Sequence, residues 1–156
     1  MTVIGFDVGK TGGIAVISPA GYSVQAMPVA GDDLDIGAIA AFVRDSKPDI
    51  AVVERAAARP KQGVVSMFSF GKRYGILLGV LGALGVRTEI VRPQEWKRVV
   101  LAGTAKDKDA AIAYCRRAYP KASLLPTARS RTPHDGMADA LSIASYGMRT
   151  YLSRGL

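Results

Sequence analysis

At 156 residues, the chain is long enough to bury the core of one domain of ordinary size, and we expect a single domain over 1–156. Hydrophobic residues make up 49% of the chain and charged residues 22%, a balance that excludes an intrinsically disordered protein. The one cysteine, Cys115, excludes an internal disulfide and a multi-thiolate zinc site, and therefore favours a reducing cytoplasm. The N-terminus has no signal-peptide pattern, and the longest apolar stretch, residues 74–86, is shorter than the roughly 20 residues of a membrane span.

The positive charge is concentrated in the second part of the chain. Lysine and arginine total 21 against 13 aspartates and glutamates, which gives a formal net charge of +8. Residues 1–50 hold 3 basic and 6 acidic side chains, whereas residues 51–156 hold 18 and 7. A surface this basic attracts polyanions, so nucleic acid is the partner that the charge favours.

The N-terminal third predicts a meander of three strands. An apolar run covers residues 2–8, the glycines at 12 and 13 turn the chain into a second run over 13–18, and a turn at 19–21 leads into an alternating segment over 22–29. Apolar residues at helical spacing then predict an amphipathic helix over 33–46, for which Asp32 and Asp33 are the expected caps.

The rest of the chain predicts alternating strands and helices. Strands are expected over 49–54 and 88–93, with a helix over 64–85 between them and further helices over 94–101, 106–118 and 134–153. Glycines recur at every fourth position of the first of these helices, at Gly71, Gly75 and Gly79, and indicate a close approach to the sheet or to a second copy of the chain. This order predicts an α/β fold, with a mixed five-stranded sheet flanked by helices on both faces.

Four acids occupy positions where a carboxylate needs a partner. Asp7 and Glu54 each end an apolar strand, and burying a carboxylate is costly without a compensating charge. Asp135 and Asp139 are four residues apart on a predicted helix, so they lie on one helical face and repel each other. If the two strands are neighbours and the helix crosses their ends, the four acids meet, and their oxygen ligands favour Mg²⁺ or Mn²⁺.

Four segments in this order resemble the RuvC-type Holliday junction resolvases, particularly the small phage-borne members. The segments are VIGFDVG (3–9), AVVER (51–55), RPQEWK (92–97) and HDGMADAL (134–141). The resemblance implies an RNase H-like fold, a homodimer, and a nuclease that uses two Mg²⁺ or Mn²⁺ ions per active site to nick paired strands of a four-way DNA junction. It also implies that Asp7 bridges both ions.

The resemblance implies roles for further residues. Glu54 and Asp139 would each hold one ion, and Asp135 would complete the metal set. Lys97 and Lys108 match lysines near the scissile phosphate, so the expected catalytic set comprises the four acids and Lys108. The expected DNA-binding residues are Arg55, Arg59, Lys61, Lys72, Arg73, Lys97, Lys108, Arg129 and Arg131.

The chain departs from the family pattern at two places. Family members usually carry an acid or a histidine three residues before the last aspartate, where this chain has Gly136. Two neighbouring residues could take its place as the fourth group of the site. Asp135 is favoured by its spacing to Asp139, whereas His134 is expected at the helix N-terminus. The aromatic residue that often follows the glutamate is replaced by three alanines at 56–58. Phe68 and Phe70 are possible substitutes, but their spacing favours the core, as does that of Trp96.

The leading hypothesis is a cytoplasmic, structure-selective endonuclease that resolves four-way junctions by two-metal-ion hydrolysis, leaving 5′-phosphate and 3′-hydroxyl ends. Two alternatives stay open on the same residues. One is a branched-DNA-binding module without catalysis, and the other is a ribonuclease that acts on RNA–DNA hybrids.

Overall fold

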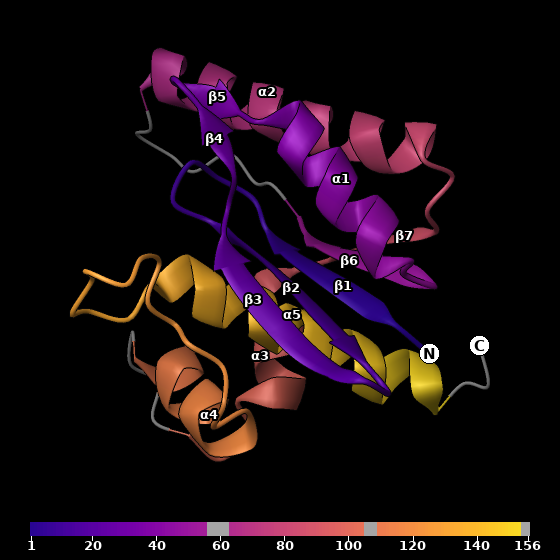
Figure 1. Cartoon of the computed structure of the whole chain (residues 1–156), viewed down its shortest axis with the longest axis vertical. Helices are drawn as coiled ribbons and strands as arrows, with labels where there is room; N and C mark the ends of the chain where they lie inside the picture. The colour runs from indigo at the N-terminus through magenta and orange to yellow at the C-terminus, as the bar shows by residue number, and fades with distance from the viewer. Residues whose placement is uncertain (56–62, 105–108, 154–156) are drawn as a thin grey trace.

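The computed structural model describes residues 1–55, 63–104 and 109–153 (Figure 1). A five-stranded sheet forms its centre, and its strands follow one another in the order β3-β2-β1-β6-β7. The strands are β1 (Val3–Asp7), β2 (Gly13–Ser18), β3 (Gly21–Ala26), β6 (Ile50–Glu54) and β7 (Thr88–Val91). The first three are antiparallel neighbours, while β6 and β7 are added in parallel to β1. The predicted mixed sheet is therefore confirmed.

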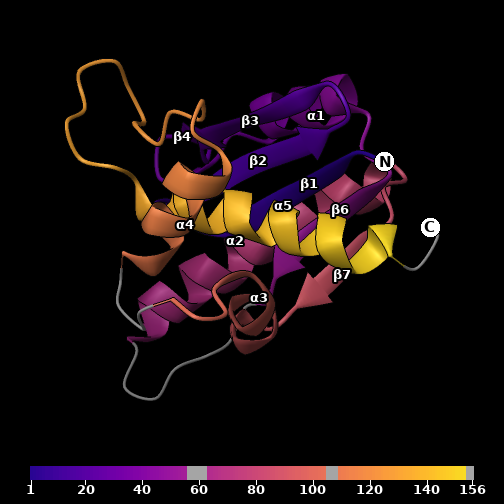
Figure 2. The ribbon, with the colours of Figure 1, turned by 90° about the horizontal axis from the view of Figure 1, so that it is seen from below.

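Helices cover both faces of the sheet (Figures 1 and 2). On one side lie α1 (Ile36–Ser46) and α2 (Val64–Ala83); on the other lie α3 (Pro93–Val100), α4 (Ala110–Ala118) and α5 (Asp135–Leu152). Side chains of β1 alternate between the two cores, since Ile4 and Phe6 pack with Leu77 of α2, whereas Val3 packs with Leu141 of α5. Both faces of the central strands are buried, as the apolar runs predict.

The start of α1 differs from the prediction. Asp35 is the N-cap, and its side chain accepts a hydrogen bond from the Ala38 amide at 2.9 Å. The expected caps were wrong: Asp33 belongs to β5 (Asp33–Leu34), which pairs with β4 (Val29–Ala30), and Asp32 pairs with Lys10. The hairpin keeps residues 33 and 34 paired, so the chain leaves it only at Asp35, and α1 begins at Ile36.

The first turn of α5 lies directly on the beginning of β2. A Cβ atom at Gly13 would stand 2.5 Å from the carbonyl oxygen of Gly136, and a Cβ at Gly136 would overlap the backbone of Thr11 and Gly12. Only glycine permits this approach of backbone to backbone. Since Gly13 pairs with Asp7 across β1 and β2, the contact sets the height of α5 relative to the end of β1.

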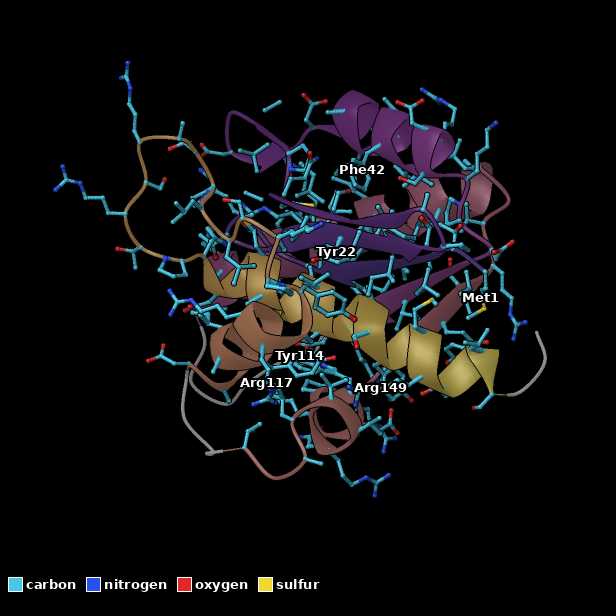
Figure 3. All side chains as sticks on the ribbon, turned by 60° about the horizontal axis from the view of Figure 1, so that its bottom comes forward. Met1, Tyr22, Phe42, Tyr114, Arg117 and Arg149 are labelled. Atoms are coloured by element: carbon cyan, nitrogen blue, oxygen red, sulfur yellow. The ribbon has the colours of Figure 1, made fainter. Side chains whose placement is uncertain are left out.

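Polar side chains hold the three helices of this face together. The Tyr114 hydroxyl of α4 lies 2.6 Å from the Ser145 hydroxyl of α5, and Arg149 donates both to Tyr114 Oη at 3.1 Å and to the Val99 carbonyl of α3 at 3.2 Å. Figure 3 shows Tyr114 and Arg149 among these helices. The network fixes α3 against α5, the two helices that carry candidate site residues.

Helix α2 leaves an apolar face uncovered. Val64 and Phe68 are 82% and 73% exposed, and nothing lies within 4 Å of a Cβ added at Gly75. The sheet therefore does not supply the close approach that the glycines indicate, and the expectation that Phe68 is core was wrong; Phe70 is partly buried against the core. By length and composition alone, α2 could also cross a membrane, which the uninterrupted apolar stretch had not indicated.

Candidate active site

Three elements bring the predicted acids to one edge of the sheet. Asp7 is the last residue of β1 and Glu54 the last of β6, and these strands are parallel neighbours with Phe6 paired to Val53. The carboxyl ends of parallel strands meet at the same edge, so the two carboxylates are brought together there. Helix α5 begins at Asp135 and carries Asp139 one turn later.

Asp7 is partly buried and surrounded by negative charge. Its pKa is raised from 3.8 to about 8, first by burial and then by the charges of Asp139 and Glu54, against the lowering effect of Lys97. Three carboxylates and one lysine therefore act on each other across β1, β6, α5 and α3. A carboxyl whose pKa is raised by burial together with specific charged neighbours is typical of functional sites.

Asp139 shows the same pattern more weakly. Its pKa is raised from 3.8 to about 6, first by burial; Lys97 acts against this rise, and the charges of Glu54 and Asp135 add to it. Asp135 is exposed and acts on the site through Asp139. The predicted pair on α5 thus interacts, with Asp139 nearer the centre of the cluster and Asp135 at its rim.

Trp96 holds the Glu54 carboxylate in place. Its indole Nε1 donates a hydrogen bond to Glu54 Oε2 at 2.6 Å, and its side chain is fully buried. The neighbouring Lys97 Nζ lies 5.1 Å from the centre of the Trp96 ring. The expectation that Trp96 is core is confirmed, but its contact with the site was missed, because no spacing in the sequence relates it to Glu54.

His134 lies at the helix N-terminus, as expected. It is the N-cap of α5, where its Nδ1 accepts a hydrogen bond from the Met137 amide at 3.2 Å. A ring nitrogen engaged in a cap has its lone pair committed to the backbone. Asp135 is consequently the better candidate for the fourth group of the site.

The donor set fits a hard divalent cation in its chemistry. All four groups are carboxylates, the oxygen ligands that Mg²⁺ and Mn²⁺ prefer, and the raised pKa values of Asp7 and Asp139 show that their charges repel. Within residues 1–55, 63–104 and 109–153, no three His, Cys, Asp or Glu side chains are gathered closely enough to hold a metal ion as they stand. The acids therefore fit the ions by the chemistry of their oxygen atoms, and their side chains would have to move to close around an ion.

The predicted DNA-binding residues fall into separate groups. Arg55 follows Glu54 directly, and Lys97 is close enough to the acids to lower two of their pKa values. Arg129 and Arg131 are exposed in the loop before α5. Arg55 and Lys97 therefore lie beside the acids, and the other two lie in the loop that leads into α5.

Two predicted DNA-binding residues are engaged elsewhere. Lys72 forms an ion pair with Asp33, and Arg73 donates a hydrogen bond to the Asp32 carbonyl at 2.7 Å, so both are held at the small hairpin beside α1. The structure does not bring them to the acids. Three further predictions, Arg59, Lys61 and Lys108, lie outside the described residues.

Comparison with known proteins identifies the fold. No family model and no curated protein matches the chain. Among solved structures, RuvC of Thermus thermophilus is similar over 97% of both chains, with a TM-score of 0.63 and 21% identity. The chain has the RuvC fold. The same RuvC in complex with a Holliday junction substrate gives a TM-score of 0.68 at 19% identity, covering 99% of this chain and 96% of that one.

The RuvC fold also occurs in a more distant neighbour. The fowlpox virus Holliday junction resolvase gives a TM-score of 0.55 at 13% identity, over 96% of this chain and 99% of the viral one. The resemblance in the sequence is thereby confirmed for the fold, and it extends over nearly the whole chain.

Proposed function

We propose that the protein is a metal-dependent endonuclease that resolves four-way DNA junctions. The observation that carries this proposal is the meeting of Asp7, Glu54 and Asp139 at the carboxyl edge of a RuvC fold, where their charges act on one another. Two solved neighbours, from Thermus thermophilus and fowlpox virus, are described as complexes with Holliday junction DNA. The basic residues around the same edge provide the charge that a DNA backbone requires.

The acids would divide the work of holding two Mg²⁺ or Mn²⁺ ions. Asp7, central in the cluster, would bridge both, and Glu54 and Asp139 would hold one each, with Asp135 completing the set. When bound, such ions polarise the scissile phosphate and activate the attacking water, leaving 5′-phosphate and 3′-hydroxyl ends. Trp96 would keep Glu54 Oε2 occupied, so that Oε1 stays available. Lys97 would offset negative charge beside the scissile phosphate, and Lys108 is proposed to assist there.

A homodimer would place two such sites on one junction. Three observations support a second copy on α2: the exposed apolar side chains Val64 and Phe68, the open glycine positions at 71, 75 and 79, and the absence of an acid from the helix itself. Glycines let two helices approach closely, and an apolar face of this kind is typical of interfaces. We therefore propose a second chain, and not a lipid bilayer, as the occupant of this face.

The proposed location is the cytoplasm, of a bacterium or of a phage-infected cell. Cys115 is buried, burial raises the pKa of its thiol to about 11, and its Sγ lies 3.6 Å from the Ser142 hydroxyl. A thiol in that environment is a packing residue and not a nucleophile.

Cleavage of defined substrates tests the proposal. Purified protein is incubated with an end-labelled four-way junction, the matched linear duplex and an RNA–DNA hybrid, in Mg²⁺, in Mn²⁺ and in EDTA. We expect paired, metal-dependent nicks in the junction alone, lost in Asp7→Asn and kept in Asp45→Asn, which alters an exposed acid of α1. Cleavage of the hybrid would identify a ribonuclease instead, and binding without any cut would identify a DNA-binding module.

A further inference from the structure

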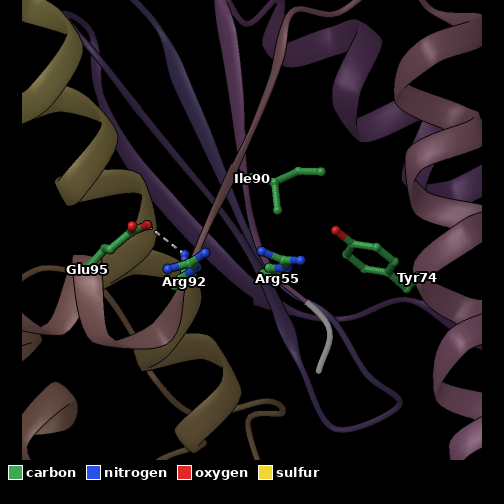
Figure 4. A pocket seen from close by; sticks show the side chains of 5 residues that line it. All are labelled: Arg55, Tyr74, Ile90, Arg92 and Glu95. Carbon is green, nitrogen blue, oxygen red and sulfur yellow. Dashed lines mark hydrogen bonds between the residues drawn. The ribbon is translucent and has the colours of Figure 1, made fainter. Parts of the chain in front are cut away.

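A hollow lies beside the acid cluster, at the carboxyl edge of β6 and β7. Its volume is about 700 Å³, and its described lining comprises Arg55, Tyr74, Ile90, Arg92 and Glu95 (Figure 4). Arg55 directly follows β6, Tyr74 comes from α2, Ile90 from β7, and the other two from the start of α3. The hollow therefore joins the sheet edge to helices from both faces.

The hollow is positively charged on one side. Neither the Arg55 nor the Arg92 guanidinium forms an ion pair with a residue in the described part of the chain. Glu95, the one acid in the lining, accepts a hydrogen bond from the Arg92 amide at 3.0 Å, while the Arg55 amide donates to the Val91 carbonyl at 2.8 Å. The two backbones are thus fixed, and both guanidinium groups face the same space (Figure 4). Guanidinium pairs of this kind suit a phosphate.

The other side of the hollow carries an aromatic side chain. The Tyr74 ring stands across from the arginines in Figure 4, and Ile90, which is 50% exposed, lies between the two sides. Burial raises the pKa of the Tyr74 hydroxyl, and the nearby Arg55 lowers it. An aromatic ring beside an exposed aliphatic side chain is a surface on which a nucleobase stacks.

Two residues of the hollow are close in the chain to residues of the proposed catalytic centre. Arg55 is the neighbour of Glu54 in the chain, and the helix that begins at Arg92 also carries Trp96 and Lys97, which contact the acid cluster. A DNA strand whose phosphate lies at the acids would therefore place an adjoining nucleotide in the hollow. A ligand that fits this lining has one anionic group and one flat ring, and a nucleotide has both.

We propose that this hollow binds one nucleotide of the DNA strand next to the cleaved bond, with its phosphate at Arg55 and Arg92 and its base against Tyr74. This inference rests on the proposed function and deepens it, because it assigns a place to the strand beyond the acids. Tyr74 is then the aromatic residue that contacts DNA, in a chain that has alanines at 56–58.

Photochemical cross-linking tests the base contact. Wild-type protein first locates the cut, and 5-iododeoxyuridine is then placed at each position around it in a four-way junction bound to Asp7→Asn, which we expect to bind without cutting. Irradiation should link one position to the peptide that contains Tyr74. The link should disappear in Tyr74→Leu, with affinity for the junction about tenfold lower. Phe70→Leu, one turn away on α2, should change neither.

A salt titration tests the phosphate contact. The logarithm of the junction-binding constant is plotted against the logarithm of salt concentration for each variant. The magnitude of the slope for Arg92→Gln should be smaller by about one than that for Arg44→Gln. Arg44 lines a different hollow, near Asp49 and the amino end of β6, so the control removes the same charge at the other edge of the sheet.

The outcomes separate the two proposals. Cross-links to Phe68 or Phe70, or equal slopes for the two arginine variants, in a protein that cuts junctions would overturn the nucleotide site and leave the resolvase proposal intact. A wild-type protein that neither binds nor cuts any junction would overturn both.

Discussion

Replacing Asp7 by Asn should stabilise the metal-free protein at alkaline pH, although it should abolish cleavage. A carboxyl whose pKa is raised on folding contributes stability that is fully present below its unfolded pKa of 3.8 and lost as the pH rises through about 8. In the folded protein above pH 8, Asp7 is ionised beside Asp139 and Glu54. Asparagine has nearly the same volume and no charge, so it removes the cost of burying a charge, which is the largest cause of the shift, and also this repulsion, at little cost in packing.

The size of the effect follows from the shift. The pKa rises from 3.8 to about 8. At about 1.4 kcal/mol for each pKa unit, this corresponds to about 6 kcal/mol in the free energy of unfolding. Water and side-chain relaxation reduce both the cost of burying the charge and the repulsion, so we expect Asn to recover about half of the roughly 6 kcal/mol, or about 3 kcal/mol. For a chain of this length, that raises the melting temperature by about 6 to 12 °C.

Thermal and denaturant unfolding in EDTA, at pH 5 and at pH 9, measure this difference. The gain in stability of Asp7→Asn over wild type should be large at pH 9, where Asp7 of the folded wild-type protein is ionised. The gain should be small at pH 5, because Asp7 of the folded protein is still protonated there and carries no charge. Asp45→Asn should change neither value, since Asp45 is exposed on α1. If Asp7→Asn destabilises the protein equally at both pH values, Asp7 is not the strained centre of the cluster, and the electrostatic argument fails.

Three further substitutions test separate features. Trp96→Phe removes the hydrogen bond to Glu54 and should weaken Mn²⁺ binding, measured by calorimetry, about tenfold. Tyr114→Phe deletes another buried hydrogen bond and should leave Mn²⁺ binding unchanged. If the two variants bind Mn²⁺ with equal affinity, Trp96 does not position Glu54. Gly75→Glu should convert a dimer into a monomer in sedimentation with no loss of stability, because no atom lies within 4 Å of the new Cβ; a persisting dimer would exclude α2 as the interface. Gly136→Ala should cost at least about 3 kcal/mol in unfolding free energy, unlike Gly75→Ala, and a smaller loss would show that α5 can shift.

The sheet and the acid pair on it could be predicted because both depend on local pattern. Two apolar runs that each end in an acid, Asp7 and Glu54, predict buried strands, and parallel pairing then brings their ends together. The spacing of Asp135 and Asp139 predicts a shared helical face in the same way. In each case the relevant distance is a few residues long or is fixed by the common direction of the strands.

The features that were missed depend on contacts far apart in the chain. Trp96 meets Glu54 across 42 residues, and nothing in its own segment indicates which acceptor lies above it. Asp32, Asp33 and Asp35 are equivalent caps by residue type, and the small hairpin decides between them. The position of Phe68 in a helical pattern predicts that it lies on the apolar face of its helix. The pattern does not show whether another element of the fold covers that turn of the helix.

The contact of Gly13 with Gly136 determines which positions of this chain can tolerate substitution. The backbone of α5 rests on the backbone of β2 at this crossing, and this contact sets the position of the acids on α5 relative to Asp7. A side chain at either glycine would meet backbone atoms, which cannot be moved aside by repacking other side chains. In a saturation mutagenesis screen for cleavage, both glycines should therefore be as intolerant as the carboxylates, although neither has a functional group. A search for essential residues that considered only chemically reactive side chains would overlook them.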